Sequence, residues 1–279
     1  MKIQNGAIID IPDSRDYQWS EIGKSSTPFD WNKGYDVEEE LGFKIPVKSQ
    51  GNSLSCGGQA FSYYAQVLEA LNTGTFEERS AKFLYSQCWL PEGGSRGRDI
   101  CKILQTQGSS REAFCPSYYT DKTPLSEEDY RDTSCINDIV RQDAKGAIAI
   151  TYANVNPTID EVAQAIRDNK GCVIGLTGEN NGTWMTEFPK PPTKNQWNHW
   201  VYACKAKIID GKKYIGFINS WGEECGNKGV QWIGEDYFNT VLSYNAVWQV
   251  WTFVLKKVDE KRNLLLTLLT ALLKLWKKN

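Results

Sequence analysis

The sequence predicts an α+β fold, because helical patterns come first along the chain and strand-like patterns follow them. Apolar residues recur three or four positions apart in three segments, which predicts helices at 56–71, 97–107 and 159–169. Later runs are rich in β-branched and aromatic residues, which predicts strands at 172–176, 200–204, 213–218 and 246–254. Aromatic residues form 12% of the chain, with 11 tryptophans, so most of it should be packed.

Size and charge narrow the classes of protein to consider. A chain of 279 residues fits one large domain, or one domain of two lobes with appended ends. A formal net charge of -2 provides no basic field for nucleic acid. No secretory signal is visible in residues 1–20, so we expect the cytoplasm of the producing cell or association with a virus. Eight cysteines in such a chain favour buried free thiols over a disulfide framework.

The first element of the main domain follows a polar arm. Residues 1–27 show no strong periodicity, so we expect an extended N-terminal leader that ends before the domain. From Ser55 onward the apolar spacing becomes helical and continues to 71, where Asn72, Thr73 and Gly74 stop it. Cys56 therefore opens a long, mostly buried helix.

The chain contains one histidine, His199, so any imidazole chemistry must use it. Cys56 precedes it by more than half the chain length, and Asn219 follows it. A cysteine, a distant histidine and a later asparagine are the parts of a thiol-based acyl transfer site, in which the base and its orienting amide reach the thiol only after folding. Each residue alone would more simply be structural, and the combination favours catalysis.

Four separated pieces of sequence carry a family resemblance. Segment 46–61 reads PVKSQGNSLSCGGQAF and places Gln50 six residues before Cys56. His199 is followed by a predicted strand, then by Asn-Ser-Trp-Gly at 219–222 and by Gly-Asn-Lys-Gly-Val at 226–230. Together these pieces resemble papain-like cysteine peptidases, the C1 family, in a bacterial or viral type without a long pro-domain. The resemblance covers about 28–256 and implies two lobes, a helical one with a central helix and a β-barrel-like antiparallel one.

The resemblance implies a role for each residue. Cys56 would be the nucleophile, His199 the acid and base, and Asn219 the amide that orients the imidazole. A helix N-terminus and a protonated His199 would both favour the Cys56 thiolate. The Gln50 side chain and the Cys56 backbone N–H would stabilise the negative oxygen of the tetrahedral intermediate.

Substrate contacts carry over from the resemblance as well. Gly93 and Gly94 resemble the glycine pair whose backbone binds an extended substrate as an added strand, and a plain Gly-Gly turn is the alternative interpretation. Trp221 resembles the indole that covers the bond between the asparagine and the histidine. Candidates for the specificity pocket are Thr183, Trp184 and Met185.

Two positions depart from the family pattern. Gly57 stands where the family usually has an aromatic residue after the cysteine, and Ser53 stands where many members have a disulfide cysteine. The 27-residue leader is too short for the long helical inhibitory segment of many relatives. Either this arm blocks the cleft alone, or no inactive precursor exists.

The C-terminal segment 257–279 predicts an amphipathic helix rich in leucine and lysine. Its apolar core, 264–276, is too short to span a bilayer. The broad leucine face instead requires a membrane surface, a partner or self-associating helix, or the body of the protein to cover it.

The sequence thus predicts a cysteine endopeptidase that acts on protein or peptide substrates through a thioester intermediate, with no metal or cofactor. Two alternatives stay open. One is an amidase or endopeptidase that cleaves peptidoglycan cross-links, and the other is a catalytically silent docking protein that has kept the fold.

Overall fold

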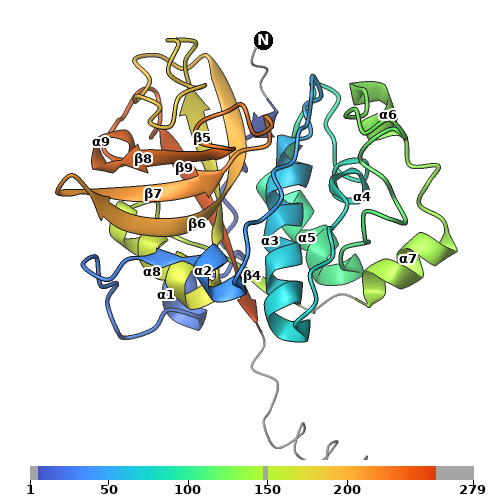
Figure 1. The fold of residues 1–279 in the computed structure, drawn as a ribbon, viewed down its shortest axis with the longest axis horizontal. Helices are drawn as coiled ribbons and strands as arrows, with labels where there is room; N and C mark the ends of the chain where they lie inside the picture. The colour runs from blue at the N-terminus through green and yellow to red at the C-terminus, as the bar shows by residue number, and fades with distance from the viewer. Residues whose placement is uncertain (1–5, 147–149, 256–279) are drawn as a thin grey trace, which may run out of the picture.

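The computed structural model describes residues 6–146 and 150–255, which form two lobes that meet along a central helix (Figure 1). The helical lobe is built around this helix, α3 (Cys56–Thr73), which begins at the predicted nucleophile. It ends at Gly74, whose left-handed conformation (φ +73°) closes the helix as the sequence predicts. The same lobe holds α4 (Ala81–Tyr85), α5 (Gly97–Gln107), α6 (Glu127–Arg131) and α7 (Asp138–Lys145).

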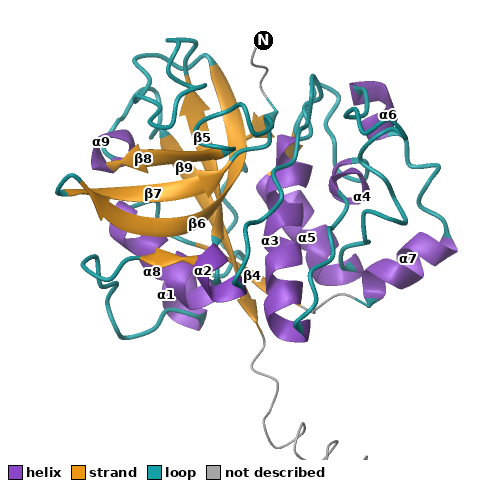
Figure 2. Ribbon diagram, in the orientation of Figure 1, coloured by secondary structure: helices purple, strands orange, loops and turns teal. Residues whose placement is uncertain are grey.

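The second lobe is an antiparallel sheet of seven strands (Figure 2). Its order is β4 (Ile150–Asn154), β9 (Val247–Leu255), β5 (Cys172–Gly178), β6 (Trp197–Ile209), β7 (Lys212–Ile218) and β8 (Val230–Gly234), and β2 (Tyr35–Asp36) pairs with β6. This lobe also holds α8 (Ile159–Asn169), which packs on the sheet, and the shorter helices α1 (Trp19–Ile22), α2 (Val37–Leu41) and α9 (Glu235–Phe238). The three predicted helices and four predicted strands are confirmed, and so is the two-lobed α+β architecture.

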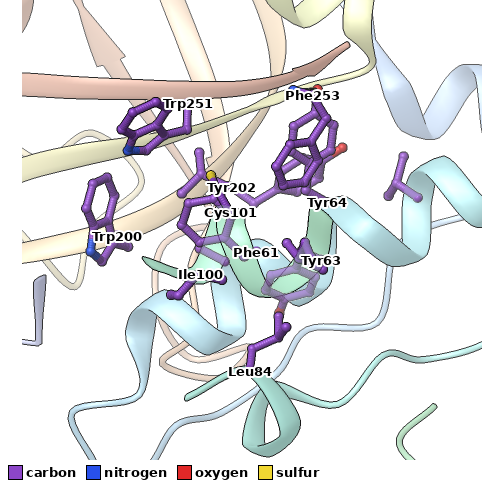
Figure 3. Close-up of a cluster of buried hydrophobic side chains, with 14 of the residues drawn as sticks. Phe61, Tyr63, Tyr64, Leu84, Ile100, Cys101, Trp200, Tyr202, Trp251 and Phe253 are labelled. Atoms are coloured by element: carbon purple, nitrogen blue, oxygen red, sulfur yellow. Dashed lines mark hydrogen bonds between the residues drawn. The ribbon is translucent and has the colours of Figure 1, made fainter. Parts of the chain in front are cut away.

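An apolar core runs across the junction of the lobes (Figure 3). The Tyr64 ring on α3 stacks on Phe253 of β9, with ring centroids 4.4 Å apart, and its hydroxyl donates to the Asn169 carbonyl oxygen at 2.7 Å. Phe61, one turn earlier, packs edge-on against Trp200 of β6. These contacts hold the N-terminal half of α3 beside the strand that carries His199.

The N-terminal arm packs on both lobes. Its strand β1 (Ala7–Ile8) pairs in parallel with β3 (Ser95–Arg96), which precedes α5. Further along, Trp19 of α1 is fully buried in the core of the β lobe. The arm is thus a fixed part of this structure, and its division from the domain at residue 27 stays a prediction.

The predicted leucine-rich helix at 264–276 lies outside the described residues. Within the described part of the chain, no helix combines the length and apolar character needed to cross a membrane.

Candidate active site

Cys56 is the first residue of α3 and is fully buried where the two lobes meet. Ser55 caps the helix without a side-chain bond, because its hydroxyl is paired with that of Ser53. The unpaired N–H groups of the first turn are therefore left to act on the sulfur, and that of Gly57 lowers the pKa of the Cys56 thiol. A second N–H on the sulfur comes from Trp200, on β6 of the other lobe.

This second contact places the thiol next to the predicted base, since Trp200 directly follows His199 on β6. The imidazole is buried, and its Nε2 lies 2.8 Å from Oδ1 of Asn219, the residue after β7. The structure thus pairs His199 with Asn219 and brings Cys56 to the same point of β6.

The hydrogen bonds around Asn219 determine which imidazole nitrogen can act as a base. Asn219 Oδ1 also accepts the Ser220 backbone N–H at 2.7 Å, and Nδ2 donates to Gln231 Oε1 at 2.7 Å. Because an amide oxygen can only accept, His199 Nε2 must carry the hydrogen in their shared bond. In the neutral imidazole the lone pair is then on Nδ1, which is the nitrogen available to take a proton.

Aromatic side chains enclose the imidazole. The centroid of the Trp221 ring lies 4.6 Å from that of the His199 ring, at an interplanar angle of 31°, so the indole covers the histidine. Trp184 and Trp197 complete the enclosure with edge-on contacts to the same ring. The structure therefore places two of the candidates for the specificity pocket in different surroundings. Trp184 is buried beside His199, whereas Met185 is exposed.

Gln50 is tied to the segment that follows the asparagine. Its backbone N–H donates to the Ser220 carbonyl oxygen at 2.8 Å, and the Ser220 hydroxyl donates to Gln50 Oε1 at 2.7 Å. Gln50 Nε2 donates to the Ser53 carbonyl oxygen at 2.7 Å. An amide nitrogen has two hydrogens, so the second is available to a substrate oxygen.

The glycine pair lies under the N-terminal arm. Gly93 and Gly94 have φ values of +92° and +75°, which disfavour other residues, and a methyl on Gly94 would lie 2.5 Å from the Gly6 carbonyl oxygen. That oxygen accepts the Ser95 N–H at 3.2 Å. The chain's own arm, instead of a substrate, therefore pairs with this edge.

The same arm residue covers the thiol. A methyl added to Gly6 would lie 2.7 Å from Cys56 Sγ and 2.8 Å from the Leu54 carbonyl oxygen, so Gly6 sits against the sulfur. Further along the arm, Asp10 accepts from the Arg98 backbone N–H at 3.1 Å and from the Trp251 indole at 3.2 Å. The Arg98 guanidinium also forms a salt bridge with Asp16. These contacts form a latch that holds the arm against both lobes.

Burial sets the charge state of the thiol and the imidazole in this closed form. It raises the pKa of Cys56 to about 12, against the opposing effect of the Trp200 and Gly57 N–H groups. It lowers the pKa of His199 to about 4, although the bond to Asn219 acts in the other direction. Both groups are neutral here near pH 7, so the thiolate expected from the sequence does not describe the covered state.

Both departures from the family pattern have a local explanation. The Ser53 hydroxyl donates to the Gln50 carbonyl oxygen at 2.7 Å, so a hydrogen bond braces the loop at this position. Trp200 and Ile100 occupy the space that an aromatic side chain at position 57 would need.

Sequence reasoning missed several residues of this site. The only hint of Gln231 in the sequence is that it is a polar residue within an apolar strand. In the structure its side chain is fully buried. Ser220 lies inside the recognised motif but had no assigned role. Trp200, and the latch formed by Asp10 and Arg98, depend on contacts between distant parts of the chain and leave no local pattern.

All eight cysteines are free thiols in this structure. Two of them, Cys115 and Cys135, have sulfur atoms 3.0 Å apart in the helical lobe.

No family model and no curated protein sequence matches this chain. Solved structures match its fold. Xylellain, a cysteine protease from Xylella fastidiosa, has a TM-score of 0.72 and 22% identity, covering 92% of this chain and 99% of xylellain. Procathepsin L2 proteinase from the larval midgut of Tenebrio molitor has a TM-score of 0.69 and 18% identity, with 90% and 78% covered. Bromelain protease from Ananas comosus, in complex with the E64 inhibitor, has a TM-score of 0.58 and 18% identity, with 80% and 99% covered. The chain therefore has the two-lobed papain-like fold.

Proposed function

We propose that this papain-fold chain is a cysteine endopeptidase, in which Cys56, His199 and Asn219 hydrolyse peptide bonds through a thioester. The observation that carries the proposal is the hydrogen-bond network around Asn219. It leaves the lone pair of His199 on Nδ1, and β6 presents this histidine beside the residue that contacts the Cys56 sulfur. A buried structural histidine would also need an acceptor for its N–H, so it is the thiol beside this strand that favours catalysis.

The chemistry follows from these positions. His199 Nδ1 takes the thiol proton while the Cys56 sulfur attacks the substrate carbonyl carbon, so a C–S bond forms and the carbonyl oxygen becomes negative. The second N–H of Gln50 and the Cys56 backbone N–H donate to that oxygen.

The imidazolium returns its proton to the amine as the C–N bond breaks. Water then attacks the thioester with His199 as base, the C–S bond breaks, and the proton returns to the sulfur. Every proton in the cycle is thus carried by the chain's own groups.

The arm holds this machinery closed. Gly6 occupies the space next to the sulfur that a substrate carbonyl needs. Its own carbonyl oxygen is bonded to the Ser95 N–H, so it is not presented to Gln50, and the arm is not positioned for cleavage. Release of residues 6–16 would admit a substrate strand and solvent, which lowers the desolvation cost that keeps the thiol neutral.

Labelling and hydrolysis assays test the function directly. The full chain and a Gly6→Val variant, in which the new side chain cannot fit against the sulfur, are treated with a peptidyl epoxide and mapped by mass spectrometry. A mixed peptide library is then digested. We expect labelling of Cys56, faster in Gly6→Val, and peptide hydrolysis that is lost in Cys56→Ala and retained in the matched control Cys88→Ala.

Folded protein that neither labels at Cys56 nor cleaves any peptide would overturn the proposal. Cleavage of purified cell wall together with resistance of all linear peptides would instead support the peptidoglycan alternative.

A further inference from the structure

Trp200 fills the space beside Gly57, directly behind the proposed nucleophile. A methyl added to Gly57 would lie 2.8 Å from Ile100 Cδ1 and 3.3 Å from Trp200 Cδ1, and it would also overlap the Ser95 hydroxyl. The Trp200 side chain is fully buried, and its indole N–H donates to the Ser95 carbonyl oxygen at 3.1 Å. The bulky ring that the sequence lacks after the cysteine thus enters from the residue after the histidine.

Two other indoles pack around Trp200 and form with it one wall behind Ser95. A methyl on Gly97 would lie 2.5 Å from Trp251 Nε1 and 2.9 Å from Trp200 Cη2. The Trp200 ring also packs against Trp248, with centroids 4.7 Å apart and an interplanar angle of 64°. Because interiors are close-packed, an indole held on several sides cannot move aside without disturbing its neighbours. Trp200 therefore fills the space behind Ser95 and is also held in place there by its neighbours.

The arm shows the size of side chain that this wall accepts. Ala7 pairs with Ser95, and paired residues of neighbouring strands project to the same face. Its methyl therefore points to the side on which the Ser95 hydroxyl meets Gly57. Ala7 is fully buried and belongs to the apolar cluster that includes Cys56 and Trp200. An alanine methyl fills the site with no exposed surface.

We infer that Trp200 determines specificity by restricting the substrate residue opposite Ser95 to glycine, alanine or serine. The inference rests on the proposed peptidase function, with a substrate strand taking the place of the arm along β3. A leucine or phenylalanine at that position has to displace an indole that is held by its bond to Ser95. We expect kcat/KM to fall about 10- to 100-fold from alanine to leucine, and further for phenylalanine.

Cleavage profiling of the full chain on a peptide library tests this selectivity without any substitution. We expect one position close to the cleaved bond to hold glycine, alanine or serine and to exclude large apolar residues. Cleavage with leucine or phenylalanine accepted at every position would overturn the inference and leave the peptidase function intact. Absence of any cleavage, together with absence of Cys56 labelling, would overturn the proposed function and the inference with it.

Substitutions in the arm give an independent measurement in the same full chain. Ala7→Phe should prevent the arm from seating and raise peptide hydrolysis about 10-fold or more, whereas the control Ile11→Ala, at an exposed arm side chain, should not. Removing the indole should make room for the new ring. In the Trp200→Ala background, Ala7→Phe should therefore no longer raise peptide hydrolysis as it does in the otherwise unchanged chain.

Thermal melting of the Trp200 variants checks that they fold. If Ala7→Phe leaves the arm seated in the otherwise unchanged chain, the wall is not restrictive and the inference fails, whatever the stability of the Trp200 variants.

Discussion

The base side and the thiol side of the proposed site are built in different ways. On the base side, His199 lies on β6, Gln231 lies on β8 and Asn219 directly follows β7, and the hydrogen bonds among their side chains are internal to the β lobe. On the thiol side, Cys56 lies at a lobe boundary, and its surroundings include Gly6 of the arm. The orientation of the base is therefore independent of the arm, whereas the charge state of the nucleophile depends on it.

The largest expected effect is on the base side. His199→Ala removes the only imidazole, so we expect peptide hydrolysis to fall about 10⁴- to 10⁶-fold while the fold is kept. The measurement is kcat/KM on a cleaved peptide, with circular dichroism to confirm folding. Activity within about tenfold of the unchanged chain would show that another group acts as the base.

Gln50 tests the donor that the two sides share, because it contacts Ser220 on one side and Ser53 on the other. Gln50→Ala should lower kcat about 10²- to 10³-fold with little change in KM, since it removes a donor to the transition state. Steady-state kinetics separate the two parameters. An effect confined to KM would assign Gln50 to substrate binding instead.

The arm tests the thiol side alone. Gly6→Val should shift the chain toward the open form and raise activity about 10- to 100-fold, because the added carbons overlap the Cys56 sulfur. Ile11→Ala, at an exposed side chain of the same arm, should leave activity unchanged. Equal activity of Gly6→Val and the unchanged chain would mean that the arm does not restrict access.

Gln231 tests whether the orientation of the base matters. Gln231→Leu removes the acceptor for Asn219 Nδ2, so the amide loses the contact that fixes its oxygen toward His199. We expect kcat to fall about tenfold at unchanged KM. Gln66→Leu changes another buried glutamine, which accepts a backbone N–H in the helical lobe, and serves as the control for lost stability. If both variants lower kcat equally, the Asn219 network has no special role.

The last expected effect is on stability and concerns Lys48, on the segment that links the two sides. Its ammonium is buried and donates to the Ser62 hydroxyl and the Arg79 carbonyl oxygen, and burial lowers its pKa to about 8. An unfolded lysine titrates near 10.5, so between pH 8 and 10.5 the unfolded state binds more protons, and this group makes folding more favourable as pH rises.

Urea unfolding of the unchanged chain and Lys48→Met measures this dependence. The buried cysteines and tyrosines oppose the trend in both proteins, so the difference between the two proteins isolates Lys48. We expect the unchanged chain to gain stability relative to the variant from pH 8 to 10, by up to roughly 3 kcal/mol in total. A difference that stays constant across this range would mean that Lys48 keeps its ordinary pKa.

Local patterns predicted the long elements of the fold. The helix at 97–107 and the helix at 159–169 match α5 and α8 because their apolar faces repeat over three turns. The helices α4 and α6 span only five residues, too few for a periodic pattern, and they begin at the capping side chains of Ser80 and Ser126. Periodicity finds elements that bury one face, and it misses those fixed by single hydrogen bonds.

The site divides in the same way. Cys56, His199 and Asn219 were found because residue type and chain order limit which groups can do thiol chemistry. For Trp200 the sequence predicts only a place in a strand, since its relation to Gly57 depends on the packing of α3 against β6. The sequence leaves open whether the arm blocks the cleft, and the place where the arm docks gives no signal, because its contacts with β3 use backbone groups that every sequence carries.

The pH dependence of Cys56 alkylation tests most directly whether the thiol and the imidazole act as a pair. The rate of carboxymethylation is followed by mass spectrometry in Gly6→Val and in Gly6→Val/His199→Ala, from pH 4 to 10. With His199 present, the open form should react well below the pH at which an ordinary thiol ionises, and the double variant should react only as that ordinary thiol does. Superimposable profiles in the two proteins would contradict the account, because they would show that the histidine does not act on the sulfur.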